Sequence, residues 1–127
     1  MKRLTIDVRP GEYALAKLPS GSPLPSLPAS DGLVSITSTS DEVSVVSLAA
    51  IAPAGAKVDD GWRLLTVRGP LEFTLTGIMA SLAGSLAAAG VPLYAMSTYD
   101  TDHILVKDVD LDRAVNALRE AGHEVHA

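Results

Sequence analysis

The sequence predicts an α+β fold: a C-terminal half ordered strand, helix, strand, strand, helix, strand, joined to an N-terminal half that is mostly β. Two observations predict this. After residue 75, apolar residues recur every three or four positions in two stretches, and each stretch ends at a glycine. Before residue 60, short apolar stretches alternate with Pro, Gly and Ser, which favour strands and turns. The expected units are residues 1–60 and 61–127.

The first elements of the C-terminal half follow from apolar spacing. A strand is expected at 62–68, ended by Gly69-Pro70. A helix follows, with one apolar face made of Leu75, Ile78, Leu82 and Leu86. Gly90 can take the left-handed conformation that commonly ends a helix. Strands are then expected at 91–96 and 103–107.

The last elements complete the order. Asp110 is a candidate N-cap, and a second helical stripe consists of Leu111, Ala114, Val115 and Leu118. Gly122 ends this helix, and 123–126 is a short final strand. The order βαββαβ is that of a ferredoxin-like unit, with two helices on one face of a four-stranded antiparallel sheet.

The N-terminal half echoes the C-terminal half at an offset of 60. Residues 36–42 stand opposite 96–102, and 43–46 stand opposite 103–106. Such a period indicates two copies of one unit, and chance similarity between polar turns is the alternative. The Pro-rich segment 19–28 cannot be helical, so we expect 13–18 to be a strand.

Composition excludes several classes of function. The net charge of −5 argues against nucleic-acid binding, and the absence of cysteine removes disulfides, thiol catalysis and thiolate zinc sites. Charges within the first strand argue against a signal peptide, so we expect a cytoplasmic protein. The uncharged stretch 73–99 is broken at Gly90-Val91-Pro92, which favours a buried helix and strand over a membrane span.

The most informative segment is 97–107, a turn rich in hydroxyls and carboxylates that leads into an apolar strand. Beside a helix, such groups can hold a small zwitterion. His123 and His126 should point to opposite faces of a strand, and 108–112 lacks the glycine of a calcium loop. No nucleophile elbow or phosphate loop occurs. We therefore expect no metal, no cofactor and no enzymatic activity.

Three motifs carry a family resemblance: Gly-Pro-Leu-Glu-Phe at 69–73, Leu-Thr-Gly-Ile-Met-Ala at 75–80, and the segment 97–106. Together they resemble the ACT domain family, in the branch of aspartokinase regulatory domains and the cytosolic arginine sensor of animals. The resemblance is strong from residue 62 onward. The N-terminal half is similar to the diverged ACT-like unit of small bacterial members.

The resemblance implies a regulatory module that binds a free amino acid between paired ACT units. Carried over by position, one wall of the site comprises Glu72, Phe73, Thr76, Gly77 and Ile78, and the other Thr98, Tyr99, Thr101 and Asp102. The ligand carboxylate would bind at the helix start, and Asp102 would pair with the ligand's amino group or with a cationic side chain. An open sheet edge also favours a homodimer.

Simpler interpretations of these residues remain open. Asp100 and Asp102 can cap a turn, Tyr99 can be a half-buried sheet residue, and Glu72 can be a charge that favours the helix start. Two other functions are considered. One is an interaction module without a ligand. The other is a small enzyme that uses Asp102 and His103 as an acid–base pair, which the alternation of side chains along a strand opposes.

Overall fold

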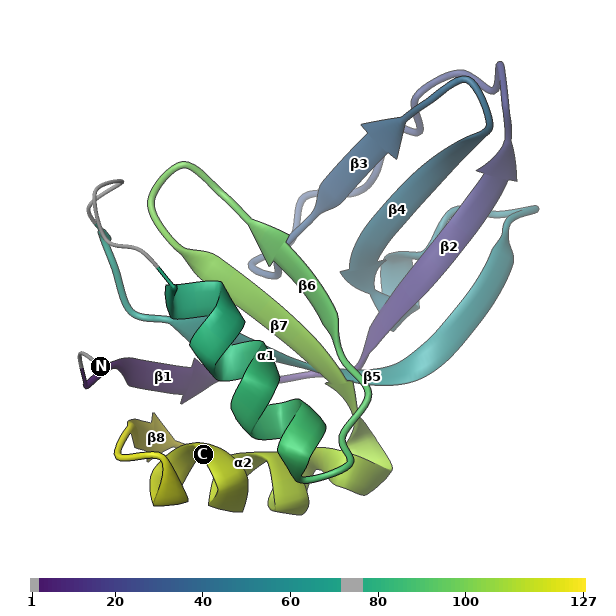
Figure 1. Ribbon diagram of the computed structural model, residues 1–127. Helices are drawn as coiled ribbons and strands as arrows, with labels where there is room; N and C mark the ends of the chain where they lie inside the picture. The colour runs from purple at the N-terminus through teal and green to yellow at the C-terminus, as the bar shows by residue number, and fades with distance from the viewer. Residues whose placement is uncertain (1–2, 72–76) are drawn as a thin grey trace. The chain divides into compact units, whose positions relative to one another are not determined.

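The computed structural model describes residues 3–71 and 77–127, and its chain divides into two compact units (Figure 1). Unit 1 comprises Met1–Pro10 and Arg63–Ala127, and unit 2 comprises Gly11–Trp62. The division expected from the sequence placed the first strand in the N-terminal half. In the structure this strand is grouped with the C-terminal half, and unit 2 is an insertion between two segments of unit 1.

Unit 1 has the predicted element order from its second strand onward. Its elements are β1 (Thr5–Val8), the end of β5 (Lys57–Val67), α1 (Ile78–Ala88), β6 (Tyr94–Ser97), β7 (Asp102–Lys107), a 3₁₀ turn η2 (Asp108–Asp110), α2 (Leu111–Glu120) and β8 (Glu124–His126). The sequence β5, α1, β6, β7, α2, β8 is βαββαβ, so the predicted α+β, ferredoxin-like fold is confirmed.

The N-terminal strand adds a fifth member to the unit 1 sheet. In spatial order the strands are β8-β1-β5-β7-β6. β1 is parallel to β8, with Ile6 paired to Val125, and antiparallel to β5, with Ile6 paired to Val67. β1 therefore separates the first and last strands of the βαββαβ unit, which would be neighbours in a simple ferredoxin-like sheet.

Both helices cover the same face of this sheet, and the core of unit 1 lies between the layers (Figure 1). The predicted helical faces are confirmed: α1 buries Ile78, Leu82 and Leu86, and α2 buries Ala114, Val115 and Leu118. They pack on sheet residues that include Ile6, Leu65, Val67, Ile104, Val106 and Val125. Leu75 lies outside the described residues.

The helix ends explain two strand boundaries that the sequence placed too early. After α1, the N–H of Gly90 donates to Ala87 and the N–H of Val91 donates to Leu86, with Gly90 at φ 74°. This pair of bonds is the Schellman motif. Because Val91 completes the helix end, β6 starts at Tyr94 and not at 91.

The end of α2 has the same form. Gly122 donates to Arg119 and His123 donates to Leu118, so β8 starts at Glu124 and not at 123. Asp110 occupies the predicted N-cap position of α2, but its side chain makes no capping bond and instead pairs with Arg113. Among the described residues, no helix has the length and apolar character needed to cross a membrane.

Unit 2 is built from strands, as predicted. Its elements are β2 (Tyr13–Pro19), β3 (Ser35–Ser38), β4 (Glu42–Leu48), a 3₁₀ turn η1 (Ala49–Ile51) and the first part of β5. The strands lie in the order β3-β4-β2-β5, and the buried centre contains Ala16, Val43 and Val45. The expected strand at 13–18 is confirmed.

Each unit contains a hairpin of the same form, β3–β4 in unit 2 and β6–β7 in unit 1. The predicted offset of 60 between equivalent residues of these hairpins is wrong by one residue. In unit 2, Ser35 pairs with Val46; in unit 1, Tyr94 pairs with Leu105, so equivalent residues are 59 apart. In the turns, Thr39 N–H donates to Glu42 O at 2.9 Å and Thr98 N–H donates to Thr101 O at 2.8 Å. An offset of 60 matches residues of similar type, but it places each residue one position away from its structural equivalent.

Candidate functional site

A cavity of about 380 Å³ lies in unit 1, between the start of α1 and the turn that joins β6 to β7. The α1 side provides Gly77, Ile78, Met79 and Ala80, preceded by Leu71. The turn provides Ser97, Thr98, Tyr99, Asp100, Thr101 and Asp102. This volume is within the range of pockets that hold small organic ligands.

Six of the nine predicted site residues line this one cavity: Gly77, Ile78, Thr98, Tyr99, Thr101 and Asp102. The other three, Glu72, Phe73 and Thr76, lie outside the described residues. Five lining residues were not predicted: Leu71, Met79, Ala80, Ser97 and Asp100. Four of these adjoin predicted residues in the motifs at 75–80 and 97–106, so both motifs pointed to them. Leu71 lies in the remaining motif, at 69–73, beside the predicted residue Glu72, and it reaches the cavity through the turn after β5.

The turn from Thr98 to Thr101 is closed by its own hydrogen bonds. Both the N–H and the Oγ1 of Thr98 donate to Thr101 O, at 2.8 and 3.2 Å. Thr and Ser hydroxyls commonly stabilise turns in this way. Tyr99, at the tip, is 81% exposed. Its ring therefore forms part of the cavity rim, and the interpretation of Tyr99 as a half-buried sheet residue is wrong.

Two further hydrogen bonds hold this turn against β5 and the segment that follows it. Thr101 Oγ1 donates to Val67 O at 2.5 Å, and Leu71 N–H donates to Asp100 O at 2.6 Å. Gly69 lies beside the same carbonyl: a Cβ built there would be 3.0 Å from Asp100 O and 3.1 Å from Thr101 Cβ. A side chain at 69 would therefore force one of the two segments to move by a few tenths of an ångström.

The start of α1 lines the cavity, and its first backbone N–H groups lack helical acceptors. The first helical hydrogen bond runs from Ser81 N–H to Gly77 O, so the N–H groups of Ile78, Met79 and Ala80 have no acceptor within the helix. Gly77 is the N-cap at φ 75°, a conformation that glycine adopts readily, and it has no side chain to cap them. A helix start of this kind favours an anion.

The charged side chains of the cavity are acidic. Asp100 and Asp102 are the charged groups among its described lining residues, which include no Lys, Arg or His. Asp102 Oδ1 accepts a hydrogen bond of 2.5 Å from Ser97 Oγ. The described lining thus combines carboxylates on one side with donor N–H groups on the other, and it suits a ligand that carries both charges.

His103 is the next residue along β7, and successive strand residues point to opposite faces of the sheet. Its ring is 9% exposed, with Nδ1 3.0 Å from Thr66 Oγ1 and Nε2 3.4 Å from Thr98 Oγ1. Burial lowers the pKa of this imidazole below its usual 6.5, although the charge of Asp102 acts in the opposite direction. The alternation does not favour Asp102 and His103 as an acid–base pair in one cleft.

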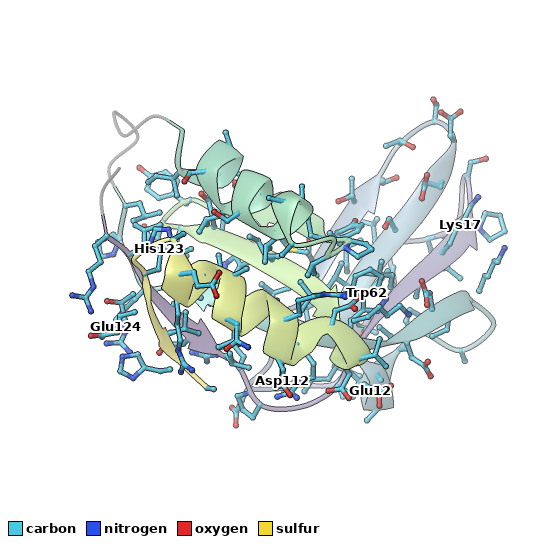
Figure 2. All side chains as sticks on the ribbon, turned by 60° about the horizontal axis from the view of Figure 1, so that its bottom comes forward. Glu12, Lys17, Trp62, Asp112, His123 and Glu124 are labelled. Atoms are coloured by element: carbon cyan, nitrogen blue, oxygen red, sulfur yellow. The ribbon has the colours of Figure 1, made fainter. Side chains whose placement is uncertain are left out.

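The other two histidines lie at β8 and not in the cavity. His123 is buried just before the strand, where its Nδ1 accepts the N–H of Leu4 at 3.1 Å (Figure 2). His126 is exposed and its Nε2 lies 2.7 Å from Glu124. Within residues 3–71 and 77–127, no three His, Cys, Asp or Glu side chains are grouped so that they could hold a metal ion.

Comparison with known sequences identifies the C-terminal part of the chain. A model described as "ACT domain" matches residues 57–120, and a second model, of an N-terminal domain, matches residues 11–54. The human and bovine "Cytosolic arginine sensor for mTORC1 subunit 1" are each 39% identical over 59 residues. That match covers 46% of this chain and only 18% of the sensor.

Solved structures extend the similarity to the whole chain. A protein from Agrobacterium tumefaciens superposes with a TM-score of 0.90 and 35% identity, over 98% of this chain and 93% of that one. The regulatory subunit of aspartate kinase from Thermus thermophilus superposes with a TM-score of 0.63, covering 95% of this chain and 99% of that one. Its identity of 9% supports similarity of fold alone.

Proposed function

The chain belongs to the ACT domain family, and we propose that it is a regulatory module that binds a free amino acid in the cavity of unit 1. One observation carries the proposal: the start of α1 and the carboxylate of Asp102 line the same cavity. The N–H groups at the helix start would bind the ligand carboxylate, and Asp102 would bind the ammonium through a charge-assisted bond. The hydroxyl-rich turn would surround the rest of the ligand. Glu72, Phe73 and Thr76 would complete the wall at the helix start.

The mechanism follows from binding linkage. A ligand that binds one conformation of the module more tightly than another shifts the population toward the first. We propose that a cytoplasmic partner protein reads this shift. We also propose a homodimer, because β6 pairs with β7 along one edge and its other edge can accept a strand of a second copy. Size-exclusion chromatography with light scattering tests the dimer, and a monomer at all concentrations would refute it.

The test of the binding proposal is a thermal-shift screen with the twenty proteinogenic amino acids, each at about 1 mM. A ligand that binds only the folded state raises the unfolding midpoint by an amount that grows with its concentration relative to Kd. We expect one amino acid, or a chemically related few, to raise the midpoint, and Asp102→Asn to abolish the effect.

The matched control is Asp112→Asn, which removes the same charge from the first turn of α2, outside the cavity (Figure 2). It should retain the full shift. Binding that survives Asp102→Asn would show that the site lies elsewhere. No shift with any amino acid would favour an interaction module without a ligand.

A further inference from the structure

His103 is buried and does not line the cavity, yet its ring is close to the cavity turn. Nε2 lies 3.4 Å from the hydroxyl of Thr98, a lining residue, and Nδ1 lies 3.0 Å from the hydroxyl of Thr66 on β5. The imidazole therefore connects the central strand of unit 1 to the first residue of the turn.

One set of hydrogen-bond directions follows if the Thr98 hydroxyl donates to Thr101 O, the contact found at 3.2 Å. The Thr98 hydroxyl has one proton and donates it to Thr101 O. With that proton used, the hydroxyl accepts from His103 and Nε2 carries the ring proton; the other tautomer would require the Thr98 hydroxyl to donate to Nε2 instead. In the neutral ring Nδ1 is then the acceptor, and Thr66 Oγ1 donates to it. One chain of donors results, from Thr66 through His103 and Thr98 to Thr101 O.

The equivalent hairpin of unit 2 has no imidazole at this position, and its turn hydroxyl is hydrogen-bonded differently. At the spacing of 59, Thr39 corresponds to Thr98 and Ser44 to His103. The Thr39 hydroxyl accepts the N–H groups of Asp41 and Glu42, at 3.1 and 3.2 Å, and so is satisfied within its own turn. In unit 1 the corresponding hydroxyl, of Thr98, lies 3.4 Å from the His103 ring on β7. Because this ring also contacts Thr66 on β5, the turn is linked to β5.

We infer that His103 is a positioning residue for the cavity: its neutral ring, oriented by Thr66, donates to Thr98 and holds the turn in the shape that binds an amino acid. This inference rests on the proposed function, since it assigns His103 a role in that same site. It also implies that protonation of His103 and binding of the ligand oppose each other. A proton on His103 would place a positive charge beside Asp102, where the ligand ammonium is proposed to bind, so affinity should fall at acid pH.

The charges around the ring agree with this direction. Asp102, adjacent on β7, favours the protonated ring, and Arg9, which follows β1, disfavours it. Burial has a larger effect than either charge and keeps the ring neutral near pH 7. An ammonium bound at Asp102 would cancel its attraction for the proton and favour the neutral ring further.

The first part of the test needs no ligand. In the full chain, NMR of the His103 ring should show the Nε2–H tautomer, and Thr66→Val, which keeps the shape but removes the donor, should mix the two tautomers. His103→Ala should accelerate exchange of the Thr98 amide several-fold, and His103→Gln should restore its protection because a glutamine N–H can reach the same hydroxyl. His123→Ala, which removes a buried imidazole remote from the turn, is the control. An Nδ1–H tautomer, or unchanged exchange in His103→Ala, would overturn the inference.

The second part uses the twenty amino acids as probes. For any of them that binds the wild type, His103→Ala should weaken affinity about three- to tenfold, the value of one hydrogen bond, with His103→Gln close to wild type. The wild type should lose affinity as pH falls below 6.5 through the lowered pKa of His103, and His103→Gln should not. Equal affinity of His103→Ala and wild type would overturn the inference. If no amino acid binds the wild type, the proposed function fails, and the ligand-free result alone decides whether His103 orders the turn.

Discussion

Replacement of Gly69 by alanine should distort the cavity turn without touching the ligand. Gly69 has no positive φ, so its backbone conformation is open to alanine. The obstacle is steric: the new Cβ would be 3.0 Å from Asp100 O, 3.1 Å from Thr101 Cβ and 3.3 Å from the backbone nitrogen of Leu71. Two of these three atoms are backbone, so relief requires the turn to move away from the segment after β5.

The expected cost is that of overpacking, about 1–3 kcal/mol. At about 2.1 cal/mol/K per residue, 127 residues have an unfolding entropy near 0.27 kcal/mol/K, so each kcal/mol lowers the midpoint by about 4 °C. Gly69→Ala should therefore lower Tm by about 4–11 °C. The hydrogen bond from Leu71 N–H to Asp100 O, now 2.6 Å, should lengthen, and its amide should exchange faster.

The assay combines calorimetry with amide exchange, and Gly84→Ala is the matched control. Gly84 lies inside α1, and a Cβ there would meet nothing within 4 Å. The same methyl group should raise stability there by up to about 1 kcal/mol, because alanine favours a helix more than glycine does. A Gly69→Ala variant as stable as wild type, with an unchanged Leu71 amide, would refute the argument that close approach requires glycine at 69.

Two further predictions concern stability. Leu82→Ala removes a fully buried side chain from the centre of α1. It should lower the free energy of unfolding, measured in urea, by about 2–5 kcal/mol. A decrease of less than about 1 kcal/mol would contradict the packing described for unit 1. Burial lowers the pKa of His123 below 6.5, so the folded state favours the neutral ring. The contribution of this ring to the free energy of unfolding is complete above pH 6.5 and is lost as pH falls through the lowered folded-state pKa. His123→Asn, which keeps an acceptor for the N–H of Leu4, should therefore show a shallower fall of Tm between pH 7 and pH 5 than wild type, and an equal fall would contradict it.

Local patterns predicted the secondary structure of unit 1 because each element is specified by its own residues. The fourfold apolar spacing from Ile78 to Leu86 fixed the buried face of α1, and Gly90 fixed its end. The site was predictable for a related reason: the start of α1 and the polar turn are short, contiguous motifs. Their convergence on one cavity follows from the βαββαβ order, in which β5 lies between β1 and β7 and α1 covers the sheet.

Long-range pairing was not predictable in the same way. Nothing in the alternation of residues 5–8 specifies that they lie between β5 and β8, since Ile6 would suit any buried strand position. The contribution of Leu71 to the cavity and of His103 to the turn depends on contacts across strands. The hydrogen bond between Thr66 and the His103 ring joins residues 37 positions apart, and no local periodicity reports it.

The placement of β1 has a consequence for how the chain is made. Ile6 leaves the ribosome well before its partner Val125, since nearly the whole of both units lies between them in the sequence. The sheet of unit 1 cannot close until synthesis has delivered β8, so the opening strand must stay unpaired on that side while the whole of unit 2 emerges. Unit 2 has its hairpin and central strand within residues 11–62 and can acquire order earlier. Contacts of such high sequence separation slow folding, so we expect the five-stranded sheet of unit 1 to be completed late.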